Sequence, residues 1–281
     1  MRRLDLATTW GTLRLEGGSR AGEGSVLLLP QLRLALDAGH PLRALVPASV
    51  VVITHGHTDH LLALPGWASQ RQLQQLPPAT VFAPRGIAAD IAELLALSAR
   101  LEGGAPYRVE VVGVSAGTRV PLRRDFALRF FATSHWTETL GCCLEWRRQR
   151  LRPEFVGLDA AALAELRRAG RPVTEEVVIP LLAATSDTGP EVFQREPWLG
   201  AVEVLVCECT FLAAEERDRA RRFGHMHLDD LLAIAPRLAV RHLVLSHLSR
   251  RQPLLEGEAR IREAVEPLTT ASLHFINTEW P

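Results

Sequence analysis

The sequence predicts an α/β protein in which helices cover two β-sheets. Expected strands come in groups, with helices between the groups, whereas a single doubly wound sheet would alternate strand and helix along the chain. Short apolar runs rich in β-branched residues are typical of buried strands, and longer segments carry apolar residues at helical spacing. The 281 residues are expected to form a single domain, residues 1–281.

The first half of the chain is expected to begin with strands and turns. Expected strands then cover residues 25–30, 32–37, 46–54, 80–84 and 107–114. Residues 61–76 are typical of a helix. A second helix is expected over 85–100, because Ile87, Ile91, Leu94 and Leu95 fall on one side of it.

The second half repeats this grouping. Expected strands cover residues 126–133, 140–146, 177–185, 202–210 and 243–246. Helices are expected from an Asp159 cap to Gly170, from a point near His227, and over 255–266. The most polar and arginine-rich region, 147–176, is expected to be a surface excursion that contains its own helix.

Composition excludes some classes of protein. The net charge is zero, so no overall field attracts the chain to nucleic acid or membrane, and an RNA-binding surface must be local. The first residues lack the apolar segment of a signal peptide, and no apolar run is long enough to span a membrane. The four cysteines are expected to be buried free thiols. We therefore expect a reducing, cytoplasmic location.

Side chains that bind metals follow expected strands at four places. At each place an apolar strand ends in a hydroxyl residue that precedes a histidine or an aspartate. These are Ile53-Thr54-His55, Thr133-Ser134-His135, Thr185-Ser186-Asp187 and Leu245-Ser246-His247. The first place continues as THGHTDH over 54–60, which adds His57, Asp59 and His60. Because strand ends at one edge of a sheet converge, and loops there carry function, these side chains are expected to meet.

The expected ligands divide into a three-histidine set, a second set of three and a bridging carboxylate. In that order they are His55, His57 and His135, then Asp59, His60 and His247, then Asp187. A three-histidine zinc site leaves a position open for water. Two metals about 3.5–4 Å apart can hold an attacking oxygen and a phosphoryl or carbonyl oxygen together. Gly56 is expected to be required, because the crowded loop favours a residue without a Cβ.

These motifs resemble a known family. HGHTDH at 55–60 resembles the HxHxDH signature of the metallo-β-lactamase fold, and the later ligands follow in that fold's order. Within the superfamily the chain is most similar to ribonuclease Z, the tRNA 3′-end processing nuclease, in its short plant-type form. ECTF at 208–211 and GHMH at 224–227 are the narrower matches. The resemblance implies an αββα sandwich of two mixed β-sheets flanked by helices, with two Zn²⁺ per chain or Mn²⁺ in their place.

The resemblance also implies roles for residues outside the ligand sets. Glu208 and His225 would assist protonation of the leaving group, and His227 could substitute for His225 or orient it. Asp59 would orient the attacking water or take its proton. The chain departs from the family pattern in several places. Among them, the usual glycine before the bridging aspartate is Ser186, and no long glycine- and basic-rich segment matches the arm that holds the tRNA elbow.

Three functions remain open from the sequence. The first is a zinc phosphodiesterase that processes tRNA precursors at the 3′ end, with Arg147, Arg148, Arg150 and Arg152 as candidate contacts to RNA phosphates. The second is a hydrolase of the same fold that acts on a small phosphodiester or another small substrate. The third is a non-catalytic RNA-binding module with structural zinc, which a ligand set with an open position disfavours. No membrane partner is expected, and a homodimer is left open.

Overall fold

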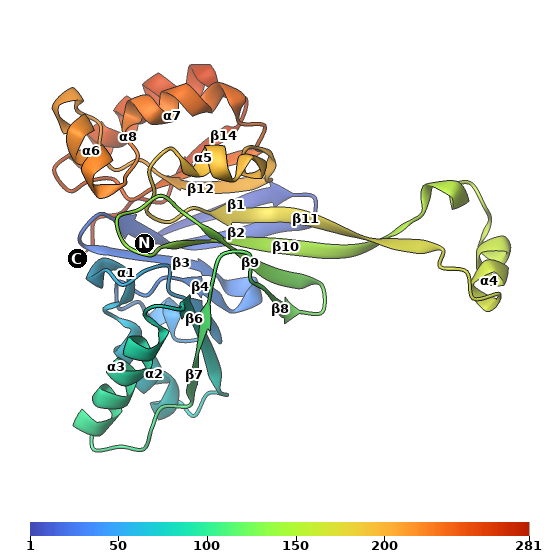
Figure 1. Cartoon of the computed structure of the whole chain (residues 1–281), viewed down its shortest axis with the longest axis horizontal. Helices are drawn as coiled ribbons and strands as arrows, with labels where there is room; N and C mark the ends of the chain where they lie inside the picture. Colours follow the sequence, from blue (N-terminus) through green and yellow to red (C-terminus); the bar gives the residue numbers. More distant parts are fainter. Residues whose placement is uncertain (281) are drawn as a thin grey trace.

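Two seven-stranded β-sheets lie face to face in the computed structural model, which describes residues 1–280 (Figure 1). The first sheet follows the chain in order. Its strands are β1 (Arg2–Thr8), β2 (Gly11–Arg20), β3 (Gly24–Leu29), β4 (Leu34–Leu36), β5 (Val50–Val52), β6 (Ala79–Pro84) and β7 (Val109–Val114). The pairs from β1 to β4 are antiparallel, and those from β4 to β7 are parallel.

The second sheet is built in the same way from the rest of the chain. Its strands are β8 (Arg119–Arg123), β9 (Phe126–Ala132), β10 (Leu140–Leu151), β11 (Thr174–Ala184), β12 (Val204–Glu208), β13 (His242–Ser246) and β14 (Ser272–Phe275). Pairs from β8 to β11 are antiparallel, and pairs from β11 to β14 are parallel. The parallel parts need helical crossovers, which accounts for the helices between the strand groups.

The α-helices cover the outer faces of both sheets, apart from α4 (Ala160–Arg168), which lies at the tip of an arm (Figure 1). The others are α1 (Thr58–Leu61), α2 (Leu64–Leu73), α3 (Ala88–Leu101), α5 (Val192–Arg195), α6 (Arg217–Phe223), α7 (Leu228–Ile234) and α8 (Leu254–Val265). Residues of α2 and α3 share a buried cluster with the first sheet, and residues of α7 and α8 share one with the second (Figure 1). The structure confirms the predicted αββα sandwich. No helix within residues 1–280 is long and apolar enough to cross a membrane.

The core between the sheets follows from alternation along the strands. In β2, Leu13 and Leu15 are fully buried, whereas the residues between and beside them are polar. They pack in one cluster with residues of the second sheet such as Leu128, Leu144 and Val244. Burial of one such side chain stabilises the fold by about 1.5–3 kcal/mol. The sandwich is therefore a rigid base for the loops at its edge.

An arm projects from the second sheet. Figure 1 shows β10 and β11 running on beyond the sandwich to a tip that carries α4. The two strands pair out to Leu151 opposite Thr174, with one register shift between Leu144 and Glu145, and α4 has no buried residue. Asp159 caps α4, as expected, by accepting a hydrogen bond from the amide of Ala162 at 2.8 Å. Region 147–176 is therefore a surface excursion, but the prediction that the strand ends at 146 was wrong. The strand was predicted too short because the outer half of the arm pairs polar residues and lacks the buried apolar face that makes a strand recognisable in a sequence.

Candidate metal centre and catalytic groove

The predicted ligand residues lie at one edge of the sandwich. His55 follows β5, His135 follows β9, Asp187 follows β11 and His247 follows β13. Three overlapping groups of side chains there have ligand atoms within 4.8 Å of one another. They are His55, His57, His135 and Asp187, then Asp59, His60 and His247, then Asp187, Glu208, His225 and His247. The first two groups match the two sets expected from the sequence.

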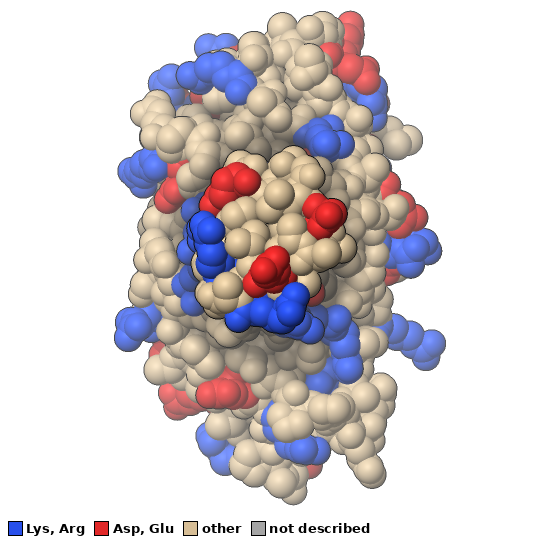
Figure 2. Space-filling view, turned by 90° about the vertical axis from the view of Figure 1, so that its right-hand side faces the viewer, with Lys and Arg blue, Asp and Glu red and all other residues tan. Residues whose placement is uncertain are grey.

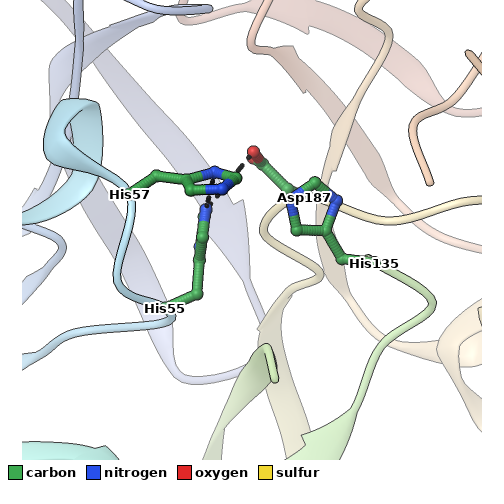
Figure 3. Close-up of side chains that lie close together, drawn as sticks. All are labelled: His55, His57, His135 and Asp187. Carbon is green, nitrogen blue, oxygen red and sulfur yellow. Dashed lines mark hydrogen bonds and ion pairs between the residues drawn. The ribbon is translucent and has the colours of Figure 1, made fainter. Parts of the chain in front are cut away.

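The first group faces inward from three loops (Figure 3). Nε2 of His55 lies 2.9 Å from Nδ1 of His57 and 3.6 Å from Oδ2 of Asp187. His135 donates a hydrogen bond from Nδ1 to the carbonyl oxygen of Gly224 at 3.0 Å, which leaves its Nε2 as an acceptor. That Nε2 is buried and has no hydrogen-bond partner among the described residues. A buried polar atom without a partner is costly, and a cation would satisfy it.

Asp187 of the first group also lies close to the second group, Asp59, His60 and His247. Nε2 of His60 lies 3.3 Å from Nε2 of His247, and Nε2 of His247 lies 3.5 Å from Oδ2 of Asp59. Oδ1 of Asp187 lies 3.5 Å and 3.4 Å from Nε2 of His60 and His247, respectively. Asp187 therefore turns one carboxylate oxygen toward each group, the arrangement expected of a bridging ligand.

Protonation states at the first group suit metal binding. Burial, reinforced by neighbouring histidines, lowers the pKa of His55 and His57, and burial lowers the pKa of His135 as well. Burial alone would raise the pKa of Asp187, but His247 and His60 overcome it, so its pKa is lowered. Neutral imidazoles and an ionised carboxylate are the forms that ligate divalent metals. The residues present fit divalent cations.

Asp37, at the end of β4, was missed by sequence reasoning. It accepts hydrogen bonds from the amide of Thr54 at 2.8 Å and from Nδ1 of His60 at 2.7 Å. It is buried, and it fixes the His60 tautomer that leaves Nε2 facing the second group. Carboxylates commonly orient ligand histidines in this way. The available signal was weaker than at the other four places, because Asp37 ends the apolar run LRLALD but no hydroxyl residue precedes it.

Backbone geometry at the strand ends departs from ordinary conformations. Asp37, Ser186 and His247 have φ angles of 62°, 55° and 61°, in the left-handed region that favours glycine. Ser186 therefore occupies a position that suits the glycine usual in this family, and its hydroxyl donates to Oγ1 of Thr54 at 2.7 Å. Strained residues of this kind gather at functional sites.

The prediction that Gly56 must lack a Cβ was wrong. A Cβ there would meet only Cδ1 of Ile87, at an ordinary 3.7 Å, and its φ lies outside the left-handed region. The glycine that the site needs is Gly39, where a Cβ would lie 1.8 Å from the carbonyl oxygen of Asp59. The motif loop packs directly against this backbone.

Glu208 and His225 form a buried pair beside the metal groups. Nδ1 of His225 donates to Oε1 of Glu208 at 2.9 Å, and the amides of Thr188 and Met226 also donate to this carboxylate, at 2.6 Å and 3.2 Å. Burial would lower the pKa of His225, but the Glu208 charge and hydrogen bond outweigh it and raise the pKa to about 9. His225 is therefore mainly protonated at neutral pH. Its ring lies 4.8 Å from that of His135, centroid to centroid.

His227, two residues further on, is not brought to the metal groups. It is the N-cap of α7, where Nδ1 accepts from the amide of Asp229 at 3.1 Å. Its Nε2 donates to the carbonyl oxygen of Ala213 at 2.9 Å. Both ring nitrogens thus have structural partners, and the expectation that His227 could substitute for His225 was wrong for this reason.

A groove of about 400 Å³ opens over the metal groups. Its floor includes His57, Asp59, Asp187, His225 and His247. Its walls carry aromatic and cationic side chains that sequence reasoning did not assign, namely Trp136, Phe211, Phe223, Arg219, Arg250 and Arg251. Acidic ligands below and arginines above suit a substrate with negative charge.

The arginines proposed for RNA binding do not line this groove. Arg147, Arg148, Arg150 and Arg152 belong to β10 and the turn after it, in the arm. Arg150 pairs with Glu175 at 2.6 Å, and Arg152 with Glu154 at 3.7 Å. The guanidinium of Arg148 lies over the ring of Trp146, at 5.5 Å from its centroid. They remain candidate contacts for a substrate long enough to reach the arm.

Comparisons with known proteins agree with this arrangement. Residues 21–168 match the family described as Beta-lactamase superfamily domain. The chain is 27% identical to tRNase Z TRZ1 of Arabidopsis thaliana over 257 residues, which are 90% of this chain and 91% of the relative. It is 32% identical to Ribonuclease Z of Natronomonas pharaonis over 225 residues, 72% of this chain and 71% of the relative. The chain belongs to the ribonuclease Z family of the beta-lactamase superfamily.

Solved structures of other proteins have the same fold as this ribonuclease Z family member. The metallo-β-lactamase fold protein YhfI from Bacillus subtilis superposes with a TM-score of 0.62 at 14% sequence identity. The likeness covers 94% of this chain and 95% of YhfI. The two proteins therefore share the αββα sandwich although their sequences have little similarity.

Proposed function

We propose that this chain is a metal-dependent phosphodiesterase that cleaves tRNA precursors at the 3′ end of the tRNA. The observation that carries the proposal is the His225–Glu208 hydrogen bond beside the two metal groups, with His225 lining the same groove as the metal-ligand candidates. Relatives named tRNase Z and Ribonuclease Z support RNA as the substrate.

The proposed cofactor is a pair of divalent cations, with zinc as the first choice and manganese as the alternative. One would be held by His55, His57 and His135, and the other by Asp59, His60 and His247. Asp187 would contribute one carboxylate oxygen to each. When bound, such ions supply Lewis-acid activation of water and neutralise charge on the phosphate.

Asp59 would position the attacking water and accept its proton. Its Oδ2 already accepts a hydrogen bond from the amide of Gly22 at 2.7 Å, which fixes the carboxylate at the groove floor. Burial would raise the pKa of Asp59, but a hydrogen bond from His247 and the nearby His60 hold it below its ordinary value. The carboxylate is therefore ionised at neutral pH and available to orient water.

His225 would donate a proton to the leaving 3′ oxygen. Glu208 keeps the imidazole charged and turns its Nδ1 away from the groove, so Nε2 is the atom left for the substrate. General acid catalysis contributes about 10²–10⁴-fold. Protonation of that oxygen gives a tRNA with a 3′-hydroxyl, and the released trailer keeps the phosphate at its 5′ end.

The arm would contact RNA outside the groove. It projects far enough from the sandwich to meet a substrate that extends past the active site (Figure 1). Figure 2 looks onto the arm from its tip and shows arginine and acidic side chains interspersed rather than a continuous basic patch. Arg147 and Arg148 have no carboxylate partner among the described residues, so they are the stronger candidates for phosphate contacts.

A second candidate is hydrolysis of a small phosphodiester. The mixed charges of the arm and a groove of about 400 Å³, within the range of small-ligand sites, favour it. A cytoplasmic location stays a prediction, and a homodimer stays open.

The test offers metal-loaded protein a tRNA precursor with a 3′ trailer and, separately, bis(p-nitrophenyl) phosphate. The proposal predicts cleavage of the precursor at one position, with a 3′-hydroxyl on the tRNA and a 5′-phosphate on the trailer. Turnover of the ester with an intact precursor would favour the second candidate. Failure on both substrates would contradict phosphodiesterase activity, and the non-catalytic RNA-binding module would then be favoured.

A further inference from the structure

Trp136 is placed unusually for a tryptophan. It follows the metal-ligand candidate His135, and 61% of its surface is exposed. Among residues 1–280 it is the one exposed aromatic side chain, while the other tryptophans are buried or half-buried. Keeping a large indole in water gains nothing for folding, so the position calls for another explanation.

The indole stands at the rim of the metal groups. Its ring centroid lies 5.2 Å from that of His57, with 37° between the planes, and it lines the groove together with Asp59 and His225. A ligand stacked on Trp136 would therefore sit within one nucleotide of a phosphate held at the metal groups.

The loop that carries Trp136 is held on both sides. Ser134 donates its amide to Oγ1 of Thr188 at 3.0 Å and accepts from the amide of Gly189 at 2.8 Å. On the far side, the Glu138 carboxylate accepts from the amide of Gly86 at 3.2 Å. An exposed side chain on an anchored backbone is preorganised, so binding to it costs little ordering of the loop.

Cationic residues that line the same groove indicate the chemistry of the ligand. They are Arg219, Arg250 and Arg251, and none of them has a carboxylate within ion-pair distance among the described residues. Aromatic faces combined with a cationic groove are typical of single-stranded nucleic acid binding. An apolar ligand would not need the arginines, and a bare phosphate would not need the indole.

We propose that Trp136 is a positioning residue that stacks on the base of a nucleotide flanking the scissile phosphate. The inference rests on the proposed function and deepens it. Stacking would fix the RNA backbone over the metal groups while remaining tolerant of base identity, because every base offers a π-face.

The experiment measures kcat/KM for RNA cleavage by wild type, Trp136→Ala, Trp136→Leu and Trp136→Phe, at equal metal content. Base–aromatic stacking of about 1–3 kcal/mol corresponds to about a 5- to 100-fold loss for Trp136→Ala. Trp136→Leu, which keeps apolar bulk without a π-face, should lose as much. Trp136→Phe should retain most of the activity. Leu101→Ala, at a distant residue that is 80% exposed, is the matched control and should equal wild type.

Two further substrates carry an abasic nucleotide on the 5′ or the 3′ side of the scissile phosphate. On one of these substrates the ratio of kcat/KM for wild type to kcat/KM for Trp136→Ala should fall toward one, because the base that would stack on the indole is missing. If the ratio stays the same on both, or if Trp136→Ala matches wild type on intact RNA, the inference is wrong while the proposed function stands. If wild type leaves all RNA uncut, the proposed function fails and the inference falls with it.

Discussion

Oε1 of Glu208 lies 2.9 Å from Nδ1 of His225, and this buried pair stands at the edge of the metal groups. The carboxylate raises the pKa of His225 to about 9, against the opposing effect of burial. The pKa of His225 in the folded protein lies above the ordinary histidine pKa. The pair therefore contributes its full stabilisation of the fold at any pH below the ordinary histidine pKa. That contribution is lost as pH rises through about 9.

Glu208→Gln should move the alkaline limb of RNA cleavage to lower pH. The neutral amide no longer favours the imidazolium, so His225 loses its proton at a lower pH and the general acid disappears earlier. The measurement is the pH profile of kcat/KM on RNA. Glu258→Gln, at a buried glutamate that pairs with Arg2 instead, is the control and should leave the limb in place. An unmoved limb in Glu208→Gln would show that this carboxylate does not tune the acid.

Asp187→Ala should lose metal from both groups, because Asp187 turns one oxygen toward each. Wild type is expected to hold two divalent ions per chain after loading with zinc or manganese. Elemental analysis of the dialysed proteins gives the stoichiometry, with the exposed Asp5→Ala as the control. Wild type that binds no transition metal after loading would contradict the metal centre.

Asp37→Asn should weaken the second metal without removing a ligand. An asparagine is neutral and has one acceptor oxygen, so it cannot replace both carboxylate oxygens that accept from Thr54 and from Nδ1 of His60, and the orientation and basicity of that imidazole suffer. Losing a group that orients a metal ligand typically costs about 10–100-fold in metal affinity. Competition with a zinc chelator measures this, and an affinity equal to that of wild type would remove Asp37 from the site.

Asp59→Ala and the double variant Arg148→Ala, Arg150→Ala should separate chemistry from RNA binding. Asp59 lies at the groove floor, so its loss should abolish turnover of RNA and of bis(p-nitrophenyl) phosphate alike. The arginines lie in the arm, so their removal should raise KM for RNA. It should also reduce the slope of log binding constant against log salt concentration, by about 0.7 for each phosphate that the protein no longer neutralises. Equally impaired small-ester turnover in both folded variants would contradict this division.

The sequence was sufficient for the sandwich and the ligand cluster because both depend on local patterns. The apolar strands that end in Thr54, Thr133, Thr185 and Ser246 can be recognised directly in the sequence. Parallel strands bring their ends to one edge of the sandwich. Asp37 also ends an apolar run, but Leu36 rather than a hydroxyl residue precedes it. Its role depends on a hydrogen bond to His60, which is 23 positions away.

Features without a buried face were harder to predict. The outer strand segments of the arm and α6, with the sequence RDRARRF, carry few apolar residues, so no periodicity marks them. His225 and His227 could not be told apart in the sequence, whereas in the structure His227 caps α7 and His225 contacts Glu208. Trp136 could not be assigned because exposure is a property of the folded loop.

The most direct test of the account is the selectivity of His225→Ala between two substrates. A p-nitrophenolate leaves readily without a proton, whereas the 3′ oxygen of RNA needs one. Measured at equal metal content, kcat/KM should fall about 10²–10⁴-fold on RNA and much less on bis(p-nitrophenyl) phosphate. His227→Ala, which removes only the α7 cap, should show no such selectivity. Equal decreases on the two substrates in His225→Ala would contradict its role as the acid and, with it, the central claim.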